Sequence, residues 1–248
     1  MRQRRPDGSV WIRTHPATFL HDHTSNRHTH EWDQLTYAAS GAMRVHTDAA
    51  SWVVPPHRAV WVPAGTVHAE QMHSPVSVRT LYFAAGLVSA LPRDCRIVNV
   101  TPLLRELVLR ASRLGVLDRK NPTHARLIAV VLDELADPSE VPLQLPMPRD
   151  GRAKRLAALL EARPHDQRSV TELARQAGAS RRTVERLFLA ETKMTVGEWR
   201  RRLRLLHGVR LLAGGESVTN AALDAGYAST SAFIAAFKKT LGVTPGKY

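Results

Sequence analysis

The sequence predicts a two-domain α+β protein. A sheet-rich first domain is followed along the chain by a pair of helices and then by an all-helical second domain. Residues 10–84 carry short runs of Val, Trp, Tyr, Thr and Leu broken by Gly, Pro, Asp and Ser, as in antiparallel strands joined by turns. After residue 91 the apolar residues take helical spacing. A stretch with four prolines then interrupts the periodicity. We expect domains at 1–137 and 150–248, with a linker at 138–149 that holds no regular element.

Six strands are expected in the first domain, and their close spacing indicates a β-barrel or an antiparallel sandwich. They are Gln34–Ser40, Met43–Thr47, Ser51–Val54, Ala59–Val62, His68–His73 and Ser77–Phe83. Two helices follow, at 101–115 and 121–137. Thr101 and Pro102 suit the cap and the first position of the earlier helix.

Every periodic segment of the second domain is predicted to be helical. The expected helices are Gly151–Ala162, Val170–Ala177, Arg181–Ala190, Val196–Ala213, Val218–Ala225 and Ser231–Thr240. We expect seven apolar residues to form the core of this domain: Leu173, Val184, Leu187, Phe188, Leu223, Phe233 and Phe237.

The charge of the chain lies mainly in the second domain. Of a formal net charge of +13 over 248 residues, the last hundred carry +10, with 19 Lys and Arg against 9 Asp and Glu. This asymmetry favours an anionic partner for that domain. Cys95 is the only cysteine, so no intrachain disulfide can form, which is typical of the cytoplasm. No apolar run approaches the roughly 20 residues of a membrane span, and no secretory signal is evident, so we expect a cytoplasmic protein without a membrane partner.

An internal repeat marks the second domain. Ser169–Gly178 matches Ser217–Gly226 at an offset of 48, and the offset becomes 49 beyond the turn, where Ser180 corresponds to Ser229. Each copy has a capped short helix, a glycine suited to a left-handed turn and a second capped helix. This is the helix-turn-helix arrangement, whose second helix enters the major groove. Two copies in a basic segment predict binding of double-stranded DNA.

A long helix, 196–213, is expected to join the two copies. At 1.5 Å per residue it would be about 27 Å long, which suits two recognition helices one duplex turn apart. Five arginines lie along it, and we expect some to contact phosphate and others to face solvent: Arg200, Arg201, Arg202, Arg204 and Arg210.

The run from Arg168 to Tyr248 resembles the DNA-binding domain of AraC-family transcription regulators. Three stretches carry the resemblance: Gly226–Phe233, then Phe237-Lys238-Lys239, then Gly242–Pro245. The resemblance implies two helix-turn-helix units that bind DNA sequence-specifically near promoters, where contact with RNA polymerase is expected.

Carried over onto this chain, the resemblance places Arg182, Glu185 and Arg186 in the first recognition helix, with Arg181 beside the DNA backbone. Arginine can bind guanine O6 and N7, and glutamate can accept from cytosine N4. In the second recognition helix the family often has a basic or amide side chain where this chain has Ala235. The remaining polar candidates there are Thr230 and Ser231 for bases and Lys238 and Lys239 for phosphate.

The first domain resembles a cupin barrel, the common sensor domain of AraC-family proteins. His28, His30, Gln34 and Gly41 follow the first cupin motif, and Pro63–His68 follows the second. The three histidines would form a site for Zn, Ni or Fe(II). Gln34 stands where a glutamate ligand is usual, which weakens this prediction. The alternatives are an organic effector pocket that these side chains line with Trp32, Tyr37, Trp61 and Tyr82, and a filled core without a ligand.

The sequence thus predicts a transcription regulator, not an enzyme, whose first domain senses a small molecule or a metal and alters promoter binding. The effector must bind one arrangement of the protein better than another. The helices at 101–115 and 121–137 would mediate a homodimer or only cover the barrel. Two other functions are open: a metal-dependent cupin enzyme with a DNA-binding tail, and a nonspecific architectural DNA protein.

Overall fold

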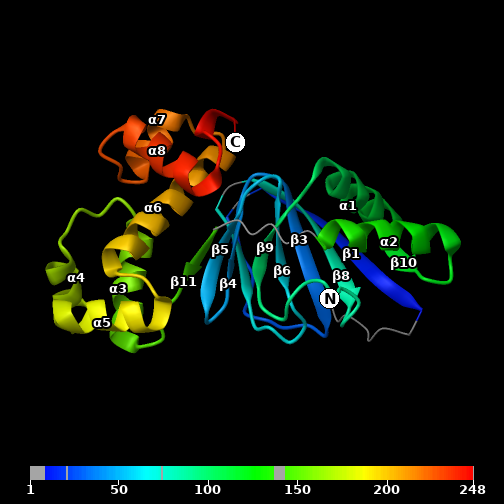
Figure 1. Ribbon diagram of the computed structural model, residues 1–248, viewed down its shortest axis with the longest axis horizontal. Helices are drawn as coiled ribbons and strands as arrows, with labels where there is room; N and C mark the ends of the chain where they lie inside the picture. The colour runs from blue at the N-terminus through cyan, green and yellow to red at the C-terminus, as the bar shows by residue number, and fades with distance from the viewer. Residues whose placement is uncertain (1–8, 21, 74, 137–142, 248) are drawn as a thin grey trace. The chain divides into compact units, whose positions relative to one another are not determined.

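The computed structural model describes residues 9–20, 22–73, 75–136 and 143–247. The chain divides into two compact units (Figure 1). The first comprises residues 1–47 and 54–142, and the second comprises residues 48–53 and 143–248.

The first unit contains an antiparallel six-stranded sheet with the order β10-β1-β8-β3-β6-β9. Its strands are β1 (Val10–Phe19), β3 (Trp32–Ser40), β6 (Arg58–Val62), β8 (Val76–Ala84), β9 (Arg96–Asn99) and β10 (Val116–Asp118). A second sheet contains, in this unit, β4 (Met43–His46), β7 (Ala69–Met72) and β2 (His23–Thr24), with β7 in the middle. The sheets stay separate, so the barrel is not closed and the fold is a jelly-roll-like pair of sheets. The six expected strands, which include β5 of the second unit, are confirmed to within two residues at each end.

The two faces of β3 have different surroundings because its side chains alternate. Leu35 and Tyr37 belong to the apolar core beneath the helices. Gln34 and Thr36 point to the other face, where the register sets Tyr82 opposite Gln34 and Thr80 opposite Thr36. This second face of the strand carries the polar side chains of the candidate effector site.

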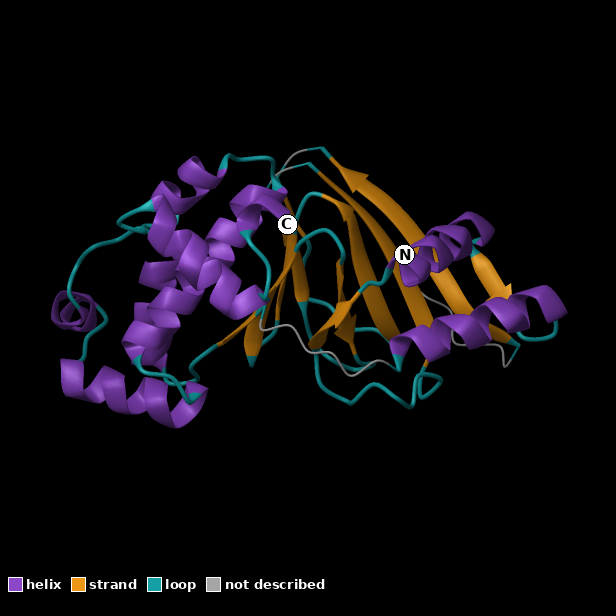
Figure 2. Cartoon of the chain, turned by 45° about the horizontal axis from the view of Figure 1, so that its top comes forward, coloured by secondary structure: helices purple, strands orange, loops and turns teal. Residues whose placement is uncertain are grey.

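Two helices cover the outer face of the large sheet (Figure 2). They are α1 (Pro102–Leu114) and α2 (Pro122–Leu135), which confirms the predicted helical pair. The Thr101 side chain accepts from the Leu104 backbone N–H, and Asn121 caps α2 in the same way. Leu104 and Val108 are fully buried against the sheet.

The second unit has six helices among its described residues, all at the predicted positions to within two residues. They are α3 (Gly151–Ala162), α4 (Val170–Gln176), α5 (Arg181–Thr192), α6 (Val196–Ala213), α7 (Val218–Asp224) and α8 (Thr230–Leu241), followed by the short 3-10 helix Pro245–Lys247. Gly178 and Gly226 end α4 and α7 with φ angles of 75° and 80°, a conformation that glycine adopts without strain. Phe188 and Trp199 pack with ring centroids 5.5 Å apart and join α5 to α6.

The expectation that residues 138–149 hold no regular element is wrong in its described part. Gln144–Pro146 forms strand β11, which pairs antiparallel with β5 (Ala50–Val54) through residues 50–52; residues 138–142 lie outside the described part. Pro146 is tolerated because it ends the strand, and its carbonyl accepts from Trp199 Nε1 at 2.7 Å. Burial of Leu145 stabilises the strand.

Leu223, which was expected in the core, is 56% exposed. The repeat explains the error, because at an offset of 48 Leu223 corresponds to Arg175, which faces solvent. The buried leucine of the first copy, Leu173, corresponds to Ala221, which is buried too. An apolar residue therefore occupies a solvent-facing position of α7.

Candidate functional site

Helix α5, predicted to be the first recognition helix, separates its cations from its core residues. Arg181, Arg182 and Arg186 are exposed, whereas Val184 and Phe188 are buried on the other side. Ser180 caps the helix by accepting from the Thr183 backbone N–H. The helix therefore presents three guanidinium groups to solvent and, through them, can bind phosphate or guanine.

Glu185 has a contact that the sequence did not predict. It is half-buried, and its Oε2 accepts from the backbone N–H of Val196, the first residue of α6, at 3.3 Å. This hydrogen bond stabilises the junction between α5 and α6. A hydrogen bond from cytosine to Glu185 would compete with it for the same carboxylate.

Helix α8, predicted to be the second recognition helix, has a less polar exposed side. Ser231 and Ala235 are exposed and Thr230 is half-buried, while Phe233 and Phe237 are buried. Lys238 and Lys239 are exposed in the last turn. The helix thus offers hydroxyl groups at its start and cations at its end, with a small apolar surface between them.

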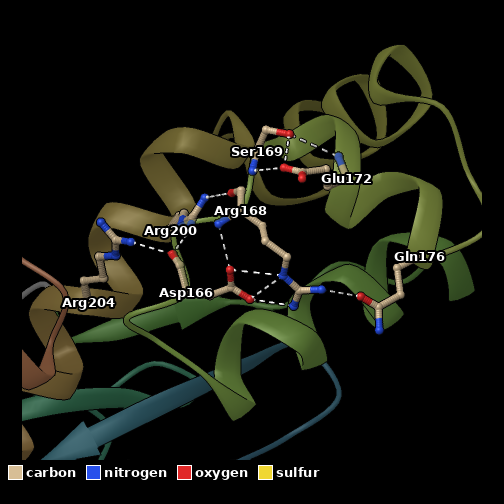
Figure 3. A network of polar contacts seen from close by, with 7 residues as sticks. All are labelled: Asp166, Arg168, Ser169, Glu172, Gln176, Arg200 and Arg204. Carbon is tan, nitrogen blue, oxygen red and sulfur yellow. Dashed lines mark hydrogen bonds and ion pairs between the residues drawn. The ribbon is translucent and has the colours of Figure 1, made fainter.

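Arg200 and Arg204 on α6 bind backbone carbonyls of the protein itself. Arg200 donates to the carbonyls of Asp166 and Arg168, and Arg204 donates to that of Asp166 (Figure 3). Arg204 also donates to the Pro164 carbonyl. Both guanidinium groups hold the segment between α3 and α4. For Arg200 and Arg204 the structure thus shows a role other than phosphate contact or free solvation.

In the first unit, His28, His30 and His68 come together as the motifs predict. The backbones of His28 and His68 pair through reciprocal hydrogen bonds of 2.9 and 3.0 Å. Their ring centroids lie 4.4 Å apart, and the His30 ring lies 5.1 Å from that of His68. The three imidazoles form one cluster.

The hydrogen bonds of two imidazoles leave their Nε2 atoms as acceptors. His28 Nδ1 lies 2.9 Å from the Asn26 carbonyl, and His68 Nδ1 lies 3.0 Å from the Thr66 carbonyl. A carbonyl only accepts, so each Nδ1 carries the proton and each neutral ring keeps a lone pair on Nε2. His68 Nε2 is buried and has no hydrogen-bond partner among the described residues. Burial lowers the pKa of His68 to about 4, which keeps the ring neutral.

Gln34 connects the imidazoles to a carboxyl group. Its Oε1 lies 2.5 Å from His30 Nε2, and its Nε2 donates to Thr36 Oγ1 and to Glu70 Oε1, both at 2.7 Å. Burial raises the pKa of Glu70. We use "histidine cluster" for His28, His30, Gln34, His68 and Glu70.

Sequence reasoning missed Glu70, although a signal for it was present. Residues two apart on a strand share a side. Glu70 follows His68 by two positions, so the alternation that predicted a common side for His28 and His30 applies here as well.

The His30 ring faces two acceptors. Its Nδ1 lies 2.5 Å from the Trp32 carbonyl and its Nε2 lies 2.5 Å from Gln34 Oε1, and a neutral imidazole can donate to only one of them. Within the described part of the chain, no group of three or more His, Cys, Asp or Glu side chains is arranged to hold a metal ion. A Zn, Ni or Fe(II) site at the three histidines stays a prediction from the sequence motifs.

The four aromatic side chains expected in one pocket lie on two faces of the large sheet. Tyr82 contacts the His30 ring at 5.5 Å between centroids, and Trp32 shares the face of Gln34 by alternation. Tyr37 and Trp61 instead belong to the core beneath α1 and α2. The separation arises because successive side chains of a strand point to opposite faces of the sheet. Trp61 lies opposite Leu35, whereas Tyr82 lies opposite Gln34.

A cavity of about 740 Å³ lies beside the start of β3. It is lined by Trp61, Asp33 and Arg93, together with residues of the 63–64 and 85–92 loops. The Asp33 carboxylate accepts from the backbone N–H groups of Ala64 and Gly86 at 2.8 and 3.1 Å, so it holds these loops in place.

The described residues contain no helix that is both long and apolar enough to span a lipid bilayer.

Comparison with known families identifies both units. The AraC-like ligand binding domain matches residues 17–178, and a helix-turn-helix domain matches residues 173–248. The chain is 33% identical to the HTH-type transcriptional regulator NimR of Escherichia coli, over 91% of this chain and 82% of NimR. The chain belongs to the AraC family of transcriptional regulators.

Two further similarities were found. RipA of Corynebacterium glutamicum, another HTH-type transcriptional regulator, is 36% identical over 42% of this chain and 31% of its own length. The structure of Vibrio cholerae ToxT with a bound unsaturated fatty acid aligns over 99% of this chain and 96% of ToxT, at 12% identity and a TM-score of 0.39.

Proposed function

We propose that α5 and α8 enter successive major grooves of one operator, and that Arg182 and Arg186 supply most of the base recognition. The observation that carries this proposal is the exposed cationic side of α5, opposite a buried apolar side. Thr230 and Ser231 would add limited recognition from α8, and Arg181, Lys238 and Lys239 would bind phosphate. The length of α6, about 27 Å, suits this spacing.

The histidine cluster is the proposed recognition site for an organic effector. His68 Nε2 is a buried acceptor and Trp32 Nε1 a buried donor, and neither has a hydrogen-bond partner among the described residues. An effector that donates to His68 and accepts from Trp32 would satisfy both groups, which are costly to leave unpaired. Tyr82 would contact an apolar part of the same molecule.

The proposed assembly is a homodimer in the cytoplasm that contacts RNA polymerase at promoters. Leu103 on α1 is 51% exposed and Val130 on α2 is 39% exposed. These side chains give the helical pair an apolar outer surface that a second copy of the chain would cover.

Selection of bound sites from random double-stranded DNA by the purified full chain tests the proposed DNA recognition. We expect one sequence with a strongly specified half and a weakly specified half, one duplex turn apart. Enrichment of no sequence would overturn the proposal and favour an architectural DNA protein.

A second pair of measurements addresses the effector site. We expect thermal unfolding of the full chain to be unchanged by Zn²⁺ or Ni²⁺ and shifted upward by the effector in a library of small polar organic molecules. A stoichiometric metal content together with oxygen uptake on candidate substrates would instead support a metal-dependent enzyme.

A further inference from the structure

The second unit is a duplication of three helices, and not only of the helix-turn-helix. Helices α3, α4 and α5 correspond to α6, α7 and α8. Arg155 on α3 and Arg204 on α6 lie at the same place in the two copies. A Cβ atom on Gly178 would lie 3.4 Å from Arg155 Nη2, and one on the corresponding Gly226 would lie 3.2 Å from Arg204 Nε.

Arg155 donates hydrogen bonds within its own copy of the repeat. Its Nε and Nη2 donate to the Ala177 carbonyl at 3.0 and 2.9 Å. Ala177 directly precedes Gly178, so the guanidinium group closes the turn between α4 and α5.

Arg204, in contrast, donates hydrogen bonds to the other copy of the repeat. Its Nη2 donates to the Asp166 carbonyl at 2.7 Å (Figure 3). Its Nε donates to the Pro164 carbonyl at 3.0 Å, and both carbonyls belong to the segment that joins α3 to α4. Arg200, one turn earlier on α6, donates to the Asp166 and Arg168 carbonyls. Charge-assisted hydrogen bonds from α6 thus fix the segment that directly precedes the first helix-turn-helix.

The same segment also touches the turn of the second helix-turn-helix. A Cβ atom on Gly226 would lie 2.7 Å from the Cα of His165 and 3.2 Å from Arg204 Nε. Segment 164–166 therefore lies between α6 and the glycine turn that precedes α8. Asp166 and Arg168 form an ion pair at 2.5 Å that shapes the segment from within.

We propose that Arg204 is a positioning residue that sets the distance and angle between the two recognition helices. By tying segment 164–166 to α6 beside the turn at Gly226, it joins the start of one helix-turn-helix to the turn of the other. The consequence is specificity for operator spacing, because rigidly joined recognition helices bind well only when both half-sites lie at one separation. This inference rests on the proposed reading of one operator by α5 and α8.

The test uses the full chain and an operator obtained by selection, with one or two base pairs inserted or removed between its halves. We expect the wild-type affinity to fall sharply at each altered spacing. Arg204→Ala should lose about tenfold at the original spacing, and its affinity should depend much less on spacing. Its affinity for a DNA carrying only the α5 half-site should be unchanged, and Arg204→Lys should restore part of the spacing dependence.

Arg201→Ala is the matched control, because Arg201 is exposed on the same helix. Any affinity that it loses should be the same at all spacings. A spacing profile of Arg204→Ala as sharp as that of the wild type overturns the proposal. A wild type that ignores spacing overturns the two-helix recognition itself.

A second pair of variants decides the matter if Arg204→Ala unfolds. Gly226→Ala and Gly178→Ala bear similar strain, since both φ angles are positive. A Cβ on Gly178 meets only the end of the flexible Arg155 side chain, at 3.4 Å, whereas one on Gly226 meets the backbone of His165. We expect Gly226→Ala alone to change the preferred spacing. Equal profiles for the two variants would contradict the proposal.

Discussion

Gln34 donates a hydrogen bond from Nε2 to Glu70 Oε1 at 2.7 Å, across 36 residues of sequence. This contact orients the amide so that its oxygen faces His30 and its nitrogen faces the carboxyl group and Thr36. It organises the polar face of β3.

Replacement of Glu70 by leucine should destabilise the first unit by about 1–3 kcal/mol, because a buried amide N–H of Gln34 loses an acceptor. Glu70→Gln keeps an acceptor oxygen and should cost clearly less. Denaturant unfolding of both variants measures the difference. Equal losses for the two variants would show that the hydrogen bond to Gln34 is unimportant.

Acidification should destabilise the first unit through His68. The pKa of His68 is lowered to about 4 by burial, whereas an unfolded chain has the ordinary value near 6.5. Between about pH 6.5 and pH 4 the unfolded chain therefore binds a proton that the folded chain does not. The free energy of unfolding should fall by about 3 kcal/mol over this range from His68 alone.

Three other groups modify this pH dependence. Burial lowers the pKa of His30, and burial and the Arg44 charge lower the pKa of His46 to about 4, so both histidines add to the loss. The raised pKa of Glu70 acts in the opposite direction, since its protonation on acidification favours the folded state. Unfolding of wild type and His68→Gln from pH 7 to pH 4 should show a smaller slope for the variant. Equal slopes for the wild type and His68→Gln would contradict this role of His68.

Substitution of the two candidate DNA contacts should have different signatures. Arg186→Ala should cost about 1–3 kcal/mol on the selected operator and relax the preference at one base pair. Lys238→Ala should weaken binding to all sequences alike and reduce the salt dependence. Titrations on operator and random DNA at several salt concentrations separate the two. An unchanged base preference for Arg186→Ala would exclude it from base recognition.

Disruption of the proposed dimer should follow from a charge on the outer face of the helical pair. Leu103→Glu should shift the full chain toward monomer in sedimentation experiments, because the charge would have to be buried in the interface. Leu223→Glu, at a similarly exposed leucine of α7, is the matched control. A dimer that persists in Leu103→Glu would place the interface elsewhere.

The sequence by itself determined the local elements and the duplicated motif. Helices such as α3 and α6 follow from apolar periodicity, and their bounds follow from caps such as Asp150 and Thr195. The convergence of His28, His30 and His68 was predictable because they match the two cupin motifs, which lie on neighbouring strands.

Only the tertiary structure decided which side chains meet across long separations. Strand register placed Tyr82 beside His30 and sent Trp61 to the opposite face, and it brought Glu70 to Gln34. The arginines of α6 look alike in sequence, yet Arg204 binds backbone carbonyls while Arg201 remains exposed. The physical reason is that periodicity and caps act within a few residues, whereas the partner of a long polar side chain depends on which distant backbone the fold brings within its reach.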